Sequence, residues 1–319
     1  MSVALFTLGG TISMAGTHRL TGDDLTAAMP GLRELGRPVE IQDIEKVPSA
    51  NLTAAKLLEV VDAASKAVAA GAVGVVVTQG TDTLEESSFL ADLVWPHPQP
   101  LVFTGAMRNP TLAGPDGPAN LLAALRVACS PAARDLGALV VFKEEIHAAR
   151  WVRKTHSTST ATFVSPNTGP IGHVVEDQVR VLTRPLRLDG VQGSAEPAEL
   201  DNIHVALYTV TLDDDGLLLQ GLADTHQGLV VAGYGVGHVP AALAPVLGEL
   251  AARMPVVLTS RTGAGSIVRN TYNSPGSEID LLQRGLIDGG FLDPYKARVL
   301  LRLLLATDDD LAAAFAQYC

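Results

Sequence analysis

Short apolar runs alternate with longer stretches rich in alanine and leucine in the first half of the chain. The runs are almost continuously apolar, as in strands buried on both faces of a sheet, and they lie at 2–8, 73–78, 100–103 and 138–142. The intervening stretches have helical patterns and lie at 53–70, 83–94 and 117–129. Strands and helices that alternate in this way predict an α/β fold with a mostly parallel sheet.

The segment 183–201 interrupts this alternation with prolines, glycines and scattered polar residues. It predicts a linker between a first domain, 1–182, and a second domain, 202–319. In the second domain, strands are expected at 203–208, 228–232 and 255–259, and helices at 213–223, 240–252, 294–306 and 309–318. Asp213–Asp215 and Asp308–Asp310 are interpreted as caps of the helices that follow them, because carboxylates favour a helix N-terminus.

The composition of the chain argues against nucleic-acid, metal and membrane partners. The 319 residues carry a net charge of −11, which repels phosphate backbones, so nucleic acid is not an expected partner. No Cys/His cluster has the spacing of metal ligands, so a metal enzyme is not expected. The N-terminus lacks the features of a signal peptide, and no apolar run approaches the roughly 20 residues that span a bilayer. These features predict a soluble cytoplasmic protein with no membrane partner.

Ligands of open α/β sheets bind outside the carboxyl ends of the strands, so candidate functional residues are expected in the segments that follow the predicted strands. After the first strand, Gly9 and Gly10 allow a sharp turn that exposes the hydroxyl of Thr11 at the edge of the sheet. A tight junction with an inert threonine is the alternative interpretation. The glycines of Gly233–His238 also follow a strand, but the dinucleotide-binding pattern is incomplete because position 238 is histidine.

The segment Thr78–Glu86 follows a second buried strand and opens a helix. Asp82 and Glu85 have the spacing of a helix-capping pair, which is a purely structural interpretation. The functional interpretation uses the same geometry, because a helix N-terminus favours a ligand carboxylate and Asp82 attracts a ligand ammonium. Thr81 places a hydroxyl beside both groups.

A charged run at 143–156 contains Lys154. Taken alone, such a run indicates a solvated face. Within an α/β site, however, a lysine that loses its proton can act as a base toward a hydroxyl. Thr81, Asp82 and Lys154 are therefore a candidate proton relay, with Asp82 orienting the base.

The chain resembles the bacterial-type L-asparaginases of the asparaginase/glutaminase family. The resemblance extends over nearly the whole chain and rests on eight motifs in the same order. These motifs are Gly9–Ile12, Thr78–Glu86, Thr104–Arg108, Asp116–Asn120, Ala149–Thr155, Ser165–Pro170, Ala232–His238 and Pro294–Arg298.

The resemblance implies a larger N-terminal and a smaller C-terminal α/β domain. It implies a cofactor-free hydrolase that converts asparagine to aspartate and ammonia, assembled as a homotetramer of intimate dimers. Thr11 matches the family's nucleophile, and Thr81, Asp82 and Lys154 match its second threonine and relay. Four further residues match substrate-site positions: Ser49 for the substrate carboxylate, Ala106 beside the oxyanion hole with Thr81, Glu278 from the neighbouring subunit, and His238 at a variable polar interface position. Asp82 also matches the residue that holds the α-ammonium.

Three positions depart from the family pattern. Leu8 stands where the family usually has threonine, with a modest expected effect because the side chain should point back toward the strand. Ala50 replaces a substrate-binding glutamine. No tyrosine precedes Tyr208, so the lid tyrosine that contacts the nucleophile in many relatives is absent, and His18 is a candidate substitute. A short lid predicts weak substrate affinity.

The sequence is also compatible with three other functions. Within the same enzyme class, the substrate is alternatively glutamine or D-asparagine, because pocket size decides the preference. A subunit of a tRNA-dependent amidotransferase has the same core, but its extra N-terminal domain is absent and the acidic charge disfavours tRNA. From another class, the chain is alternatively a catalytically silent amino-acid sensor, which the missing tyrosine and Ala50 support.

Overall fold

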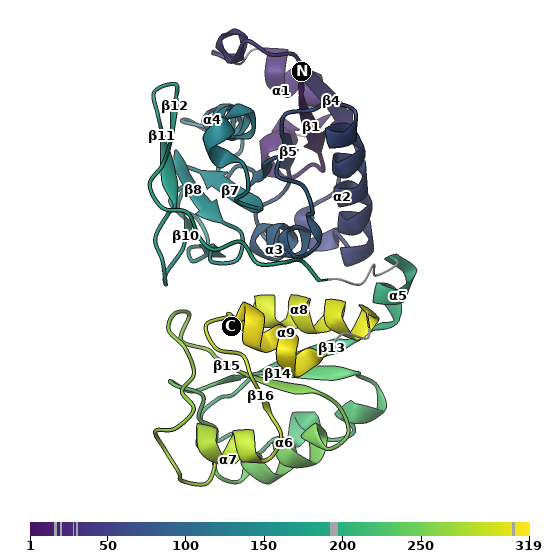
Figure 1. Ribbon diagram of the computed structural model, residues 1–319, viewed down its shortest axis with the longest axis vertical. Helices are drawn as coiled ribbons and strands as arrows, with labels where there is room; N and C mark the ends of the chain where they lie inside the picture. Colours follow the sequence, from purple (N-terminus) through teal and green to yellow (C-terminus); the bar gives the residue numbers. More distant parts are fainter. Residues whose placement is uncertain (16–17, 20, 28, 30, 192–196, 308–309) are drawn as a thin grey trace. The chain divides into compact units, whose positions relative to one another are not determined.

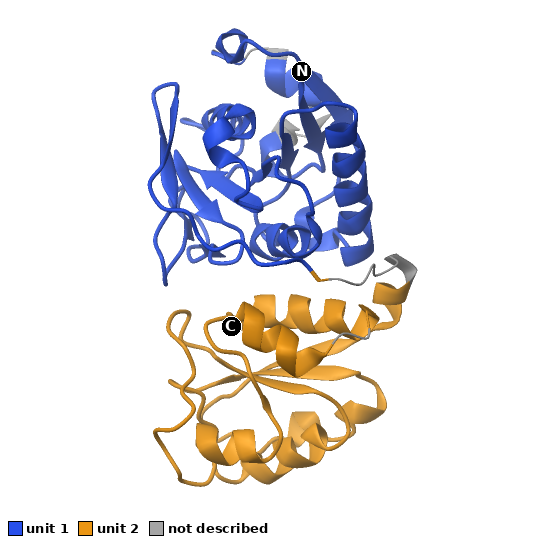
Figure 2. Cartoon of the chain, in the orientation of Figure 1, with its two compact units in different colours: residues 1–190 blue, residues 191–319 orange. Residues whose placement is uncertain are grey.

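The computed structural model describes residues 1–15, 18–19, 21–27, 29, 31–191, 197–307 and 310–319. The chain divides into two compact units, Met1–Gly190 and Val191–Cys319 (Figure 2). The division falls inside the segment 183–201. Residues 183–190 belong to unit 1, and the described helix closest to the boundary in unit 2 is α5 (Pro197–Asn202).

Unit 1 is built on an eight-stranded sheet with the order β12-β11-β8-β7-β6-β5-β1-β4 (Figure 1). In chain order these strands are β1 (Val3–Thr7), β4 (Val39–Asp43), β5 (Val75–Thr78), β6 (Leu101–Thr104), β7 (Ala138–Phe142), β8 (Glu145–Ala148), β11 (Gly172–Val175) and β12 (Gln178–Val181). The five neighbouring strands β4, β1, β5, β6 and β7 are parallel. Strands β8, β11 and β12 extend the sheet beyond β7, and each pairs with its neighbour in antiparallel fashion.

Helices cover both faces of this sheet, which explains the continuous apolar runs of its parallel strands. They are α1 (Gly22–Ala27), α2 (Ala54–Ala69), α3 (Leu84–Val94) and α4 (Gly117–Cys129). Alternate strand residues such as Leu5, Val76 and Val102 pack in one core cluster with the buried face of α4. The opposite face of the sheet packs against α2 and α3, which also contact each other.

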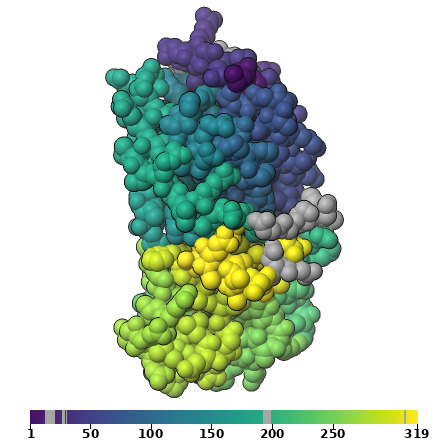
Figure 3. Space-filling view, in the orientation of Figure 1, coloured from purple at the N-terminus to yellow at the C-terminus, as the bar shows by residue number. Residues whose placement is uncertain are grey.

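Several short elements complete unit 1. They are the 3₁₀ turns η1 (Thr11–Ser13), η2 (Leu32–Leu35), η3 (Ser49–Asn51) and η4 (Pro131–Ala133), and the two-residue strands β2 (Met14–Ala15), β3 (His18–Arg19), β9 (Arg153–Lys154) and β10 (Phe163–Val164). The N-terminal residue Met1 is exposed, and the purple N-terminal segment lies at the surface of this unit (Figure 3).

Unit 2 contains a smaller parallel sheet with the order β13-β14-β15-β16. Its strands are β13 (Val205–Thr209), β14 (Gly228–Gly233), β15 (Val256–Ser260) and β16 (Ile287–Asp288). Its further helices are α6 (Leu243–Ala251), α7 (Glu278–Gln283), α8 (Pro294–Thr307) and α9 (Leu311–Tyr318). The Asp310 carboxylate accepts the N–H of Ala313, which confirms the predicted cap of the last helix for the one aspartate of its run that is described.

The helix predicted at 213–223 is wrong. Only two 3₁₀ turns form there, η5 (Leu217–Leu219) and η6 (Leu222–Asp224), and Gly216 and Gly221 precede them in left-handed conformations. The Asp214 carboxylate binds the hydroxyl of Tyr208 and two backbone N–H groups, so it closes a loop instead of capping a helix. The predicted fold class is nevertheless confirmed, since both units are α/β with largely or wholly parallel sheets.

Candidate active site

The carboxyl ends of three neighbouring strands define the candidate site. Thr7, Thr78 and Thr104 end β1, β5 and β6 and lie side by side in register. The loops that follow therefore leave the same edge of the sheet, where open α/β sheets bind ligands. Thr11 and Thr81 lie on the first two of these loops.

Two glycines bring these loops into direct contact. Gly10 has φ +87°, and a Cβ atom added to it would lie 2.2 Å from the backbone nitrogen of Gly80. No side chain fits at this distance, so only glycine allows the loops to meet here. The contact lies one residue before both Thr11 and Thr81, and it brings the backbones of the two threonines together.

The third loop joins the same cluster. A Cβ atom on Gly105 would lie 3.4 Å from Cγ2 of Thr81 and 2.5 Å from the carbonyl oxygen of Gln79. The next residue, Ala106, is buried. Within the described part of the chain, the backbone N–H groups of Thr81 and Ala106 donate to no other protein group. They are therefore available to an oxygen atom of a ligand.

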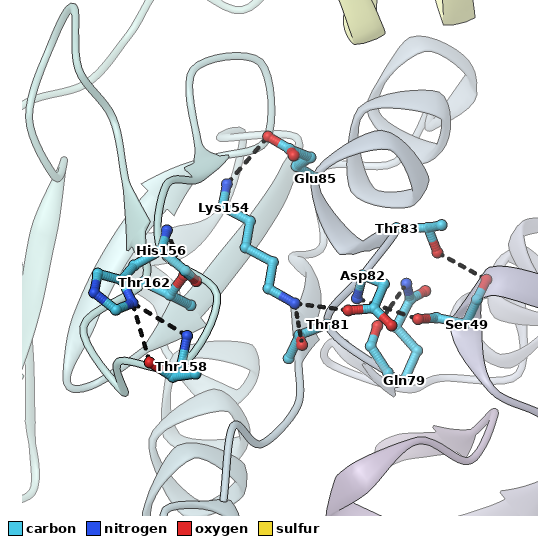
Figure 4. Close-up of polar contacts among 11 residues, drawn as sticks. Ser49, Gln79, Thr81, Asp82, Thr83, Glu85, Lys154, His156, Thr158 and Thr162 are labelled. Atoms are coloured by element: carbon cyan, nitrogen blue, oxygen red, sulfur yellow. Dashed lines mark hydrogen bonds and ion pairs between the residues drawn. The ribbon is translucent and has the colours of Figure 1, made fainter. Parts of the chain in front are cut away.

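Lys154 contacts both polar side chains of the second loop. Its Nζ lies 2.9 Å from Oγ1 of Thr81 and 2.7 Å from Oδ1 of Asp82 (Figure 4). The lysine side chain is 16% exposed and the aspartate side chain is 69% exposed, so the pair lies at the border between protein and solvent. The distances allow a proton to pass between Thr81 and Lys154.

The interpretation of 143–156 as a solvated face is wrong. Ile146 and His147 are fully buried because β8 is an internal strand, paired with β7 on one side and β11 on the other. Val152 is also fully buried. Lys154 follows on β9, where it pairs with Phe163 of β10.

The capping interpretation of Asp82 and Glu85 is wrong as well. Helix α3 begins at Leu84, and its N-cap residue is Thr83, whose side chain makes no capping hydrogen bond. The carboxylate of Glu85 instead accepts the backbone N–H of Lys154 at 3.1 Å. The carboxylate of Asp82 contacts the Nζ atom of Lys154.

Ser49 supports the loop of Asp82 through two hydrogen bonds. Its buried Oγ accepts the backbone N–H of Asp82 at 3.2 Å, and its carbonyl oxygen accepts the hydroxyl of Thr83 at 3.1 Å (Figure 4). Ala50 follows it in η3 and is exposed. Leu8 is fully buried, as expected for a side chain that points back into the fold. The side chain of His18 lies outside the described residues.

Two polar residues that the sequence interpretation left without a role hold the third loop. The Asp116 carboxylate accepts the N–H groups of Met107 and Arg108, and Asn120 Nδ2 donates to the carbonyl of Gly105 at 3.0 Å. The sequence did mark both residues, because they belong to the motif Asp116–Asn120 of the family resemblance. Their function is only apparent once β6 and α4 are in place.

Glu278 and His238 lie together in unit 2. The Glu278 carboxylate is fully buried and accepts the N–H groups of Tyr272 at 2.6 Å and Thr271 at 2.9 Å. Its other oxygen lies 3.2 Å from Nε2 of His238, whose ring meets Tyr272 edge to face. Burial is the largest influence and raises the pKa of Glu278. The backbone N–H groups, with the His238 contact, outweigh it, so the pKa of this carboxyl is lowered.

Among the described residues, no cluster of three or more His, Cys, Asp or Glu side chains is arranged to hold a metal ion. The described helices include none that is both long and apolar enough to cross a membrane.

The chain is similar to known proteins over nearly its whole length. Residues 2–187 match the model "Asparaginase, N-terminal", and residues 204–316 match "Glutaminase/Asparaginase C-terminal domain". The chain is 35% identical to a probable L-asparaginase of Deinococcus radiodurans, over 99% of this chain and 97% of that protein. It is 34% identical to an L-asparaginase of Bacillus licheniformis, over 96% and 95%.

A solved structure extends the likeness to three dimensions. A probable cytoplasmic L-asparaginase from Campylobacter jejuni matches with a TM-score of 0.87 at 29% identity, covering 99% of this chain and 98% of that one. The N-terminal and C-terminal family models together match nearly the whole sequence, and this match confirms the resemblance inferred from the motifs. The chain belongs to the asparaginase/glutaminase family.

Proposed function

We propose that this protein is an L-asparaginase, which hydrolyses the side-chain amide of asparagine to give aspartate and ammonia. The observation on which the proposal mainly rests is the position of Lys154 Nζ, within hydrogen-bond distance of both Thr81 and Asp82. The relatives named L-asparaginase and the family models support the same activity.

The reaction proceeds in two steps, with Thr11 as the nucleophile. Its hydroxyl oxygen attacks the amide carbon, and the C–N bond breaks to release ammonia and leave an ester on Thr11. Water then attacks this ester, which releases aspartate and restores the hydroxyl. Each turnover consumes one water molecule and needs no oxidant or reductant.

The relay moves the protons that these steps require. Thr81 lies between the loop of Thr11 and the amine of Lys154, so a proton taken from the nucleophile or from water passes through its hydroxyl toward the amine of Lys154. Asp82 orients the lysine at 2.7 Å. The N–H groups of Thr81 and Ala106 stabilise the negative oxygen of the tetrahedral intermediate, a contribution often worth about 3 kcal/mol per donor.

The substrate's α-substituents bind around the same loops. The exposed carboxylate of Asp82 holds the α-ammonium, and Ser49 binds the α-carboxylate. Glu278 is contributed by the neighbouring subunit of a homotetramer, a dimer of dimers, with His238 beside it. Because a monomer lacks this carboxylate at its site, dissociated subunits are inactive. We place the enzyme in the cytoplasm, as the Campylobacter jejuni protein is described.

The proposal is tested by measuring ammonia release from L-asparagine, L-glutamine and D-asparagine side by side, with wild type and Lys154→Ala. We expect turnover of L-asparagine by the wild type and a large loss in the variant. Turnover of glutamine alone identifies a glutaminase. Binding of asparagine without ammonia release, measured by calorimetry, identifies a silent sensor and contradicts the proposal.

A further inference from the structure

The buried carboxylate of Glu85 has no part in the relay described above. It lies in the first turn of α3, and the residue is 7% exposed. A buried carboxylate is costly unless charged or polar partners surround it. Oε2 accepts the backbone N–H of Lys154 at 3.1 Å and lies 4.0 Å from Nε of Arg153. Both of these contacts reach β9 (Arg153–Lys154), the strand that bears the lysine.

Strand β9 needs such support because it is short. It consists of Arg153 and Lys154 and pairs with the two residues of β10, and the hairpin continues with the N–H of Thr155 donating to the carbonyl of Thr162 at 2.8 Å. A two-stranded pair of this length has little stability of its own. Contacts from outside the hairpin, such as the one from Glu85, therefore help to fix the position of the Lys154 backbone relative to α3.

The same short segment of chain holds Lys154 at both ends. Thr81 and Asp82 bind the Nζ atom, and Glu85, three residues after Asp82, binds the backbone nitrogen (Figure 4). The side chain of Lys154 spans the distance between these two points of attachment. If the backbone is released, Nζ no longer has a fixed position relative to the Thr81 hydroxyl.

We propose that Glu85 is a positioning residue, whose carboxylate fixes the backbone of Lys154 so that Nζ meets the Thr81 hydroxyl. This inference rests on the proposed role of Lys154 as the base. The reach of the side chain matters more than its charge, because the acceptor must extend from α3 to the N–H of β9. A misplacement of about 1 Å in a catalytic group can cost about a hundredfold in rate.

The test compares long and short side chains at position 85. Glu85→Gln keeps an oxygen at the same reach, and we expect kcat within about threefold of wild type because a neutral acceptor is only moderately weaker. Glu85→Asp keeps the charge but is one methylene shorter, and we expect kcat to fall about ten- to a hundredfold with KM little changed. Glu59→Asp, on the exposed face of α2, is the matched control and should not change kcat.

The pair Glu85→Gln and Glu85→Asn repeats the comparison without charge, so the test survives if Glu85→Asp does not fold. Thermal unfolding identifies the folded variants. A larger loss in Glu85→Gln than in Glu85→Asp, or equal kcat in the long and short members of a pair, overturns the inference.

A double mutant separates positioning from general structural support. If Glu85 acts through Lys154, then Glu85→Asp causes no further loss of kcat in a Lys154→Ala background, whereas independent losses multiply. Multiplying losses contradict the inference. If Lys154→Ala itself leaves ammonia release unchanged, the proposed function fails; if it abolishes release while Glu85→Asp has no effect, only the role of Glu85 fails.

Discussion

A Cβ atom on Gly10 would lie 2.2 Å from the backbone nitrogen of Gly80, so these two residues meet backbone to backbone. Each precedes a threonine of the candidate site. The contact joins the loop after β1 to the loop after β5 at the point where Thr11 and Thr81 leave the sheet. The close approach of Thr11 and Thr81 therefore requires glycine at position 10, because a side chain there would push the two loops apart.

We predict that Gly10→Ala abolishes activity. The new methyl group would overlap the backbone of Gly80, which cannot move as a flexible side chain can, and the loops would separate. Gly71→Ala is the control, since Gly71 also has a positive φ, +105°, but no atom within 4 Å of an added Cβ. Both variants incur left-handed strain of roughly 1–2 kcal/mol, measurable by urea unfolding. Only Gly10→Ala should lose ammonia release; retained activity there would show that the contact is unimportant.

Asp82 is predicted to recognise the α-ammonium through its exposed carboxylate. Wild type should therefore prefer asparagine to succinamate, the analogue without an α-amino group, in kcat/KM. Asp82→Asn lacks the negative charge and should lose most of this preference, in addition to any loss of kcat from the altered contact with Lys154. The ratio of kcat/KM for the two substrates is the measurement. An unchanged ratio would assign ammonium recognition to another group.

The lowered pKa of Glu278 predicts an acid-dependent loss of stability. A carboxyl whose pKa is lower in the folded state than its ordinary value of 4.5 stabilises the fold fully above that value. The contribution is lost as the pH falls through the folded-state pKa. The free energy of unfolding of wild type should therefore exceed that of Glu278→Gln near neutral pH, and the difference should shrink below about pH 4.5. A difference that does not vary with pH would contradict the assignment.

The sequence predicted most of the parallel strands and the long helices, because burial on both faces of a sheet leaves a continuous apolar run. Val75–Thr78 and Leu101–Thr104 are wholly buried, and they appear as apolar runs without any alternation. The half-exposed parallel edge strand β4, the two-residue strand β16 and the antiparallel strands β8, β11 and β12 were not predicted. Strand β8 carries Glu145 and His147 in a charged run, so its pattern resembles a solvated face although His147 is fully buried.

Side-chain contacts across long sequence separations limited the prediction of the site. Spacing alone suggested that Glu85 caps α3, but its carboxylate reaches Lys154, which lies 69 positions later in the chain. Asp214 similarly closes a loop with Tyr208 where a helix was expected. The motifs predicted Thr81, Asp82 and Lys154 as a group, and these three residues do meet. Neither periodicity nor spacing could predict which element holds the lysine backbone.

The most direct test of the account is steady-state ammonia release from L-asparagine by Thr11→Ala, with the fold checked by thermal unfolding. Loss of an essential nucleophile commonly lowers kcat by about 10³-fold or more, so we expect near-complete loss of activity with little change in melting temperature. Thr11→Ser, which restores a hydroxyl, should recover part of the rate. A Thr11→Ala variant that retains activity within about tenfold of wild type would contradict the central claim that Thr11 attacks the amide.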